Sequence, residues 1–244
     1  MRQGIIRWVL ALVLLATCGL AGSAAGPEEN IRRTVEARFG LKVESVRRAP
    51  FLGLYELVLA GDEREIAYTD VAAAFLFSGN VYDLQSRRNL TQDRLDRLSA
   101  IRFDELPLDL AIKQVRGNGK RQLAVFSDPF CPYCKQLDQN MTVLDDVTIY
   151  TFMYPILRKD ESPEMAARIW CSPDRARAYL DLMLRNRAPG PKPQSCTAPV
   201  DKWMALGERL RIRATPVSYA GNGMRVVGSR FDELQRVLDE SGKR

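Results

Sequence analysis

Two cysteines separated by two residues, Cys131 and Cys134, are the residues of this sequence with the clearest capacity for chemistry. They lie directly after a predicted buried strand and at the start of a predicted helix. The free N–H groups and the dipole of a helix start favour an anion, so we expect a nucleophilic thiolate with a lowered pKa at Cys131. Cys134, one turn further on and expected to be more buried, would then release the product of a mixed disulfide. The pair predicts thiol–disulfide exchange, the alternatives being an inert disulfide or half of a metal site.

Two further dipeptides are predicted to support this chemistry. Pro132 suits the first helical position because it lacks an N–H group, and the pair Pro132-Tyr133 is expected to tune how oxidising the centre is. Thr215-Pro216 precedes a predicted strand well downstream, and in this position it resembles the cis-proline loop that faces the redox pair in thioredoxin folds, where the backbone of Thr215 could pair with an incoming peptide. Taken alone, this second dipeptide also suits an ordinary turn.

The remaining cysteines bear on structure and on metal binding. Cys171 and Cys196 bracket a helix and a loop rich in proline and glycine, which predicts a structural disulfide, with a second redox pair as the alternative. The sequence contains no histidine, so hydrolysis by Ser-His-Asp or Cys-His arrangements is excluded. With one closely spaced cysteine pair, a zinc site is not expected, and neither is any other cofactor.

The first 25 residues have the order of a secretory signal. Arg2 and Arg7 precede an apolar run, and small residues follow up to Ala25, after which we expect cleavage. A retained membrane anchor and lipidation of Cys18 are the alternatives. Cleavage leaves 219 of the 244 residues and lowers the formal net charge from +6 to +4. Because the remaining charges of both signs are interleaved, they suggest solvated helix faces and not a surface for nucleic acid.

Two units and a connecting helix are expected to position the cysteine pair. Residues 26–90 read as a helix behind Pro27 followed by short strands, an antiparallel α+β unit without chemistry whose strand edges would be safer paired with a second copy. The strands are predicted over 41–46, 54–59, 66–69 and 75–82. Thr91 is expected to cap a solvated linker helix over 91–103.

Residues 104–244 read as an α/β thioredoxin-like domain with a helical insert. Its predicted elements are a strand at 123–126, the redox helix at 132–141, a strand at 147–154, helices starting at Ser162-Pro163 and Ser172-Pro173, a hairpin over 217–227 and a last helix at 231–238.

The chain also resembles the periplasmic disulfide isomerase family of DsbC and DsbG over essentially all of its mature length. The matching segments are Val125-Phe126-Ser127-Asp128 before Cys131-Pro132-Tyr133-Cys134, then Ile169-Trp170-Cys171, Ser195-Cys196, Thr215-Pro216 and, near the end of the N-terminal unit, Val81-Tyr82-Asp83. The resemblance implies a V-shaped periplasmic homodimer in which the N-terminal domains pair and two thioredoxin-like domains face a shared cleft. It also implies misfolded or oxidised exported proteins as substrates, and a membrane thiol reductase of the DsbD type that keeps the pair reduced.

The leading hypothesis for function is the isomerisation or reduction of incorrect disulfides in exported proteins. The isomerase branch of the family usually has Gly-Tyr between the cysteines, whereas Pro132-Tyr133 resembles the DsbG pairing. A DsbG-like reductase of sulfenylated cysteines with chaperone (holdase) activity is therefore the alternative. A net oxidase is a third possibility, favoured if the protein is a monomer.

Overall fold

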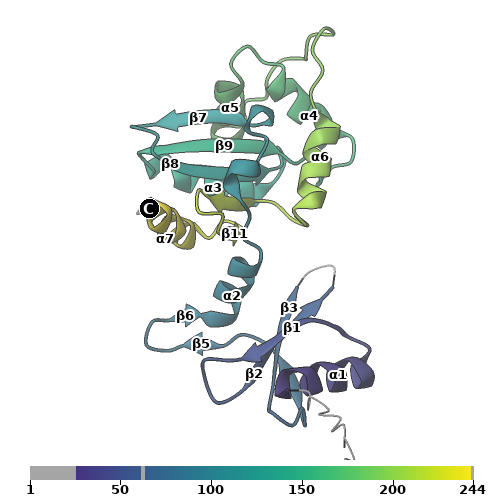
Figure 1. The fold of residues 1–244 in the computed structure, drawn as a ribbon. Coiled ribbons are helices and arrows are strands. Elements are labelled where there is room, and N and C mark those ends of the chain that lie inside the picture. Colours follow the sequence, from purple (N-terminus) through teal and green to yellow (C-terminus); the bar gives the residue numbers. More distant parts are fainter. Residues whose placement is uncertain (1–25, 62–63, 243–244) are drawn as a thin grey trace, which may run out of the picture.

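The computed structural model describes residues 26–61 and 64–242, so the predicted signal peptide at 1–25 lies outside the described residues. Figure 1 shows two mixed α/β units joined by helix α2 (Leu90–Leu98). The predicted fold class, an α+β N-terminal domain and a thioredoxin-like domain, is confirmed. Within the described ranges, no helix combines the length and apolar composition that a membrane span requires.

The N-terminal unit is an antiparallel sheet with one helix packed on it. Its elements are α1 (Pro27–Phe39), β1 (Lys42–Arg48), β2 (Tyr55–Ala60), β3 (Glu65–Thr69) and β4 (Leu76–Ser78), with the strands in the order β1-β2-β3-β4. Ile31 and Val35 of α1 are buried against the sheet, and Gly40 ends the helix in the left-handed conformation that glycine adopts without strain. The strand predicted at 75–82 is shorter in the structure, where β4 ends at Ser78. Beyond this end, Val81 N donates a hydrogen bond to Thr91 Oγ1 of α2 at 2.9 Å.

The thioredoxin-like unit is built on a five-stranded sheet in the order β11-β10-β8-β9-β7. Its elements are β7 (Ile112–Arg116), β8 (Arg121–Ser127), α3 (Pro132–Asn140), β9 (Val147–Met153), α4 (Glu161–Trp170), α5 (Arg175–Arg185), α6 (Val200–Arg209), β10 (Val217–Ala220), β11 (Arg225–Val227) and α7 (Phe231–Ser241). Strands β8 and β9 are parallel, with α3 between them in the chain, and the other strand pairs are antiparallel.

Alternate residues of β8 face opposite layers, as the pleat of a strand requires. Leu123 and Val125 pack against α3 and α7, whereas Ala124 and Phe126 pack on the face covered by α6. The central strand is therefore buried on both sides, and its carboxyl end leads directly into the Cys131-Cys134 segment.

Two helices of the insert start at residues other than those predicted. Helix α4 begins at Glu161, with Ser162 inside it, and the buried Ser162 hydroxyl donates to Asp128 Oδ1 at 3.1 Å instead of capping the helix. Helix α5 is capped by Asp174, whose carboxylate accepts from Arg177 N at 2.9 Å. Ser172 instead closes the preceding helix, because its hydroxyl donates to the Arg168 carbonyl oxygen.

The linker helix differs from its prediction in cap, length and environment. Asn89, not Thr91, caps α2, with its side-chain oxygen accepting from Gln92 N at 3.0 Å. The helix ends at Leu98, well before residue 103. Thr91, Asp93 and Asp96 are buried, so the polar side that was predicted to be solvated is a contact surface.

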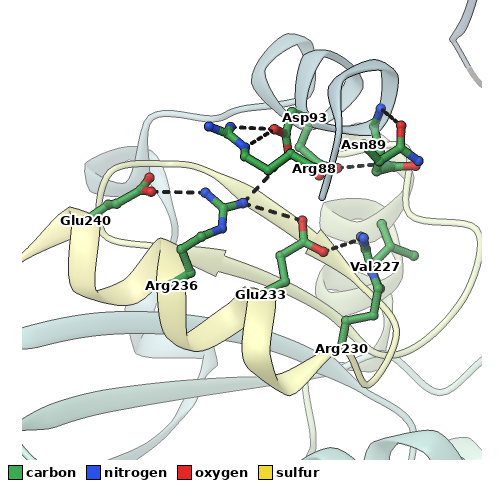
Figure 2. A network of polar contacts seen from close by, with 10 residues as sticks. Arg88, Asn89, Asp93, Val227, Arg230, Glu233, Arg236 and Glu240 are labelled. Atoms are coloured by element: carbon green, nitrogen blue, oxygen red, sulfur yellow. Dashed lines mark hydrogen bonds and ion pairs between the residues drawn. The ribbon is translucent and has the colours of Figure 1, made fainter. Parts of the chain in front are cut away.

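Part of that surface meets α7 through charged side chains (Figure 2). Arg236 of α7 lies 3.7 Å from an Asp93 oxygen and 3.0 Å from a Glu240 oxygen, while Arg88 pairs with Asp93 from the other side. Next to it, the pKa of Asp96 is raised to about 6, mainly by burial and also by the neighbouring Glu233 carboxylate, against the lowering effect of a hydrogen bond with Gln92. The connection between the linker helix and the thioredoxin-like unit is therefore largely ionic at this point.

Candidate active site

The cysteine pair lies where the end of β8 turns into α3. Cys131 is the N-cap residue of α3, and its sulfur accepts a hydrogen bond from Cys134 N at 3.2 Å. Pro132 occupies the first helical position, where its missing N–H removes nothing from the helix. A sulfur thus takes the place that a serine or aspartate oxygen usually fills at a helix start, where a negative charge is stabilised.

The loop containing Thr215 and Pro216 faces Cys131 from the neighbouring strand. The Thr215-Pro216 peptide bond is cis, and the Cys131 thiol donates to the Thr215 carbonyl oxygen at 3.3 Å. Val217, the first residue of β10, pairs with Phe126 of β8, which places the loop beside the turn into α3. Tyr133 is 62% exposed beside the cysteines, so the dipeptide that is predicted to tune the centre also borders solvent.

The two thiols have opposite acidities for reasons that the geometry explains. The pKa of Cys131 is lowered to about 6, and the largest cause is a hydrogen bond with the Cys134 side chain, which outweighs the opposing effect of burial. Thr215 and two backbone N–H groups make smaller contributions to the same lowering. Burial, and then the hydrogen bond with Cys131, raise the pKa of Cys134 well above its usual value. Both side chains are almost fully covered, at 2% and 1% exposed, but for Cys131 hydrogen bonds outweigh the effect of burial, whereas for Cys134 burial is the largest effect.

Alkylation of the reduced protein is expected to report this difference. Iodoacetamide should modify Cys131 with a half-maximal rate near pH 6, where half of this thiol is ionised, and Cys134 at least about tenfold more slowly. The Cys134→Ala variant should move the Cys131 midpoint upward, because it removes the strongest hydrogen bond to the thiolate. Mass mapping of quenched samples measures both rates, and equal rates at the two cysteines would contradict the assignment of the nucleophile.

Asp128, whose role the sequence leaves open between proton transfer and capping a turn, is held by hydrogen bonds at the base of the site. It accepts from Phe130 N at 2.8 Å, Leu157 N at 2.9 Å and the Ser162 hydroxyl at 3.1 Å. These bonds fix the loop before Cys131 to the segment after β9. In this arrangement the buried Asp128 carboxylate accepts hydrogen bonds from both loops and holds them together.

Three buried polar residues near the cysteines are not anticipated by the sequence analysis: Ser127, Asp138 and Tyr179. The Tyr179 hydroxyl lies 2.7 Å from Asp138 Oδ2 and 2.9 Å from Ser127 Oγ. One signal was available, since Asp138 follows Cys134 by one helical turn and would share its buried face.

Cys171 and Cys196 are joined by a disulfide that closes the helical insert. The bond links the end of α4 to the loop before α6 across a sequence separation of 25, and a loop of that size corresponds to about 3 kcal/mol of stabilisation. Among the described residues, no group of three or more cysteine, aspartate or glutamate side chains could hold a metal ion.

Comparisons with known proteins match both units. Residues 108–241 match the thioredoxin-like domain family, and residues 22–92 match the N-terminal domain of disulfide bond isomerase proteins. The probable thiol:disulfide interchange protein DsbC of Bordetella pertussis is 41% identical, over 88% of this chain and 77% of its own length. The thiol:disulfide interchange protein DsbC of Escherichia coli is 26% identical, over 91% of this chain and 92% of its own length.

A solved structure supports the same relationship for the larger unit. The disulfide interchange protein from Neisseria gonorrhoeae is 39% identical and superposes with a TM-score of 0.52, covering 56% of this chain and 99% of that one. The sequence matches extend over both units and are high enough to define the family. The chain therefore belongs to the DsbC family of thiol:disulfide interchange proteins, enzymes of the thiol–disulfide oxidoreductase and isomerase class.

Proposed function

We propose that Cys131 and Cys134 isomerise or reduce incorrect disulfides in exported proteins, with Cys131 as the nucleophile. The observation that supports this proposal is the contrast between the two thiols, one with a pKa of about 6 and one with a pKa raised above its usual value. A thiolate that exists at neutral pH can attack, while a neighbour that stays protonated does not compete for the substrate.

In this mechanism the Cys131 thiolate attacks one sulfur of a substrate disulfide. The S–S bond of the substrate breaks, a bond between Cys131 and the substrate forms, and the other substrate sulfur leaves as a thiolate. That thiolate can attack a different disulfide of the same substrate and so free another substrate thiolate. When a substrate thiolate then attacks the bond to Cys131, the Cys131 thiolate is regenerated and the substrate is isomerised. If Cys134 attacks Cys131 first, the substrate leaves reduced and the enzyme keeps a disulfide.

The residues around the pair are assigned to substrate binding in this proposal. An extended substrate segment would pair with the backbone of Thr215, beside Pro216, as an added strand. Pro132 and Tyr133 would contact the same segment from the helix side, because both are exposed next to Cys131. Cys171 and Cys196 would have a structural role only.

We further propose that the protein is a periplasmic homodimer. In this proposal residues 26–90 form the dimerisation domain, 91–103 the linker and 104–244 the catalytic domain. The short edge strand β4 supports the idea, because Phe75, directly before it, and Phe77, within it, are 56% and 43% exposed and an unpaired edge favours a second chain. A membrane reductase of the DsbD type would return the Cys131-Cys134 disulfide to the dithiol.

The Cys134→Ala variant separates reshuffling from reduction. It should still reactivate a scrambled multi-disulfide protein, because the substrate itself can release Cys131, but net reduction should fall to about background. Regain of the substrate's activity and consumption of a thiol reductant measure the two processes. Loss of both activities would contradict the proposal.

The same preparations also test the sulfenic acid alternative. A single-cysteine protein oxidised to sulfenic acid is incubated with the reduced wild-type protein, and its conversion to the free thiol is followed by mass. Fast conversion together with no effect on the scrambled protein would favour a sulfenic acid reductase.

A further inference from the structure

A chain of buried polar groups connects the redox helix to the helical insert. Asp138, one turn after Cys134 on α3, is 4% exposed, and its Oδ2 accepts a hydrogen bond from the Tyr179 hydroxyl at 2.7 Å. Tyr179, on α5, is fully buried, and its hydroxyl oxygen lies 2.9 Å from Ser127 Oγ at the end of β8. The exchange mechanism described above uses none of these three side chains.

The other end of this chain reaches a reacting sulfur. Cys134 and Tyr179 belong to the same buried cluster. Burial raises the pKa of Cys134, and a hydrogen bond with the Ser127 side chain acts in the opposite direction. The polar chain from Asp138 through Tyr179 to Ser127 therefore ends beside Cys134.

The direction of the hydrogen bonds follows from the number of hydrogens. A phenol has one hydrogen, and an ionised carboxylate can only accept, so Tyr179 donates to ionised Asp138. Ser127 must then donate to Tyr179, which leaves a Ser127 lone pair for the Cys134 thiol. Each hydroxyl can pass one proton toward Asp138 and take up another from the side of Cys134.

A purely structural role gives no reason for an acid at this position. An uncharged hydroxyl or amide could accept the hydrogen bond of Tyr179 without the desolvation cost of a carboxylate in an apolar core. Buried ionisable groups next to reacting atoms are typical of proton transfer.

We propose that Asp138 is the proton acceptor for Cys134, with Ser127 and Tyr179 as the relay, and that this transfer determines when Cys134 ends a mixed disulfide. The inference rests on the proposed roles of Cys131 and Cys134. It identifies Asp138 as the group that controls the choice between isomerisation and reduction.

The step starts from Cys131 joined to a substrate sulfur. The Cys134 thiol proton passes to Ser127 as Ser127 passes its own to Tyr179 and Tyr179 passes its own to the Asp138 carboxylate. The Cys134 sulfur then attacks the Cys131 sulfur, the Cys131–Cys134 bond forms, and the bond from Cys131 to the substrate breaks. The substrate sulfur takes the bonding electrons, leaves as a thiolate and is protonated by solvent. The two cysteines are oxidised and the substrate is reduced.

Asp138 is placed to make this step depend on pH. The groups that act on it are Tyr179 from α5, Arg116 from β7, and Cys131 at the head of α3. The pKa of Asp138 is raised to about 7, mainly by burial and also by the Cys131 thiolate, against the lowering effects of the Tyr179 hydrogen bond and of Arg116. A mixed disulfide has no charge on Cys131, so the midpoint of the step should lie at or below pH 7. At pH values above this midpoint the Asp138 carboxylate can accept a proton, and at lower pH values the protonated acid cannot.

The test uses the reduced full-length mature protein and an equal amount of 5,5′-dithiobis(2-nitrobenzoate). The first coloured thiolate is released when Cys131 attacks, and the second when Cys134 resolves the mixed disulfide, so stopped-flow absorbance separates the two steps. We expect the D138N variant to keep the first rate within about twofold and to slow the second by about tenfold or more above pH 7. The second rate of the wild type should rise between pH 5 and 8, and the D138N variant should lose this rise.

Two further variants make the result specific. The Y179F variant keeps the carboxylate but interrupts the relay, so it should also slow only the second release. The D181N variant makes the same change on α5, where Asp181 pairs with Arg185 at the surface, and both releases should remain at the wild-type rate. A wild-type second rate and pH profile in D138N would overturn the relay alone. Absence of the first release in the wild type would overturn the exchange chemistry and the relay together.

Discussion

Replacing Cys131 with serine is expected to lower disulfide reshuffling by about three orders of magnitude, or to the uncatalysed background if that is reached first. The serine hydroxyl is a far weaker nucleophile than a thiolate, and the sequence has no histidine that could activate it as a general base. The variant should nevertheless fold, because serine is among the best residues at the start of a helix. Its hydroxyl can accept the hydrogen bond that Cys134 N now donates to sulfur.

Reactivation of a scrambled protein, alongside thermal unfolding of the variant, measures both expectations. The C131S protein should still bind unfolded chains if the protein also has holdase activity, which a light-scattering assay of client aggregation detects. Substantial reshuffling by a well-folded C131S protein would mean that the chemistry lies elsewhere in the chain.

Removing the N-terminal unit is expected to leave thiol chemistry but to lower reshuffling of a scrambled protein by about tenfold or more. A fragment beginning at Ser99 keeps both redox cysteines and the hydrogen bond from Ile101 N to the Gly223 carbonyl oxygen. It should be a monomer, because the edge strand β4 and the exposed side chains of Phe75 and Phe77 are gone. A single catalytic unit cannot hold a substrate near a second site, so the effective concentration of substrate at Cys131 falls between successive attacks.

Mass in solution and scrambled-protein reactivation should be measured for the fragment and for the mature chain. The release of the first coloured thiolate from the aromatic disulfide reagent serves as the control, since it depends on Cys131 alone. A mature chain that is already monomeric, or a fragment that reactivates the substrate equally well, would contradict the dimer proposal and favour simple oxidation or reduction.

The redox site could be predicted from the sequence because its parts are local. The buried strand, the cysteines and the helix start follow each other within a short stretch, and hydrophobic runs and proline identify them. The same holds for the hairpin over 217–227, whose turn and strands are adjacent in the chain. The cis peptide bond before Pro216 was anticipated from its position relative to that stretch.

The linker helix and the relay could not be predicted in the same way, because they depend on contacts between distant segments. Asp93 and Asp96 look like solvent-facing residues until α7, at the far end of the chain, is placed beside them. Asp138 similarly looks like an ordinary helix residue until α5 brings the Tyr179 hydroxyl to it. In both cases a charge is buried by a partner that no local pattern identifies.

The charged contact between α2 and α7 has a mechanical consequence. Van der Waals attraction falls by up to about half when two surfaces separate by about an ångström, whereas the attraction between opposite charges declines gradually with distance. The connection therefore tolerates small rotations of the catalytic unit that an apolar contact would resist. Dissolved ions screen such charges over about 8 Å at physiological ionic strength. The stiffness of the connection is thus set jointly by the protein and by the electrolyte around it.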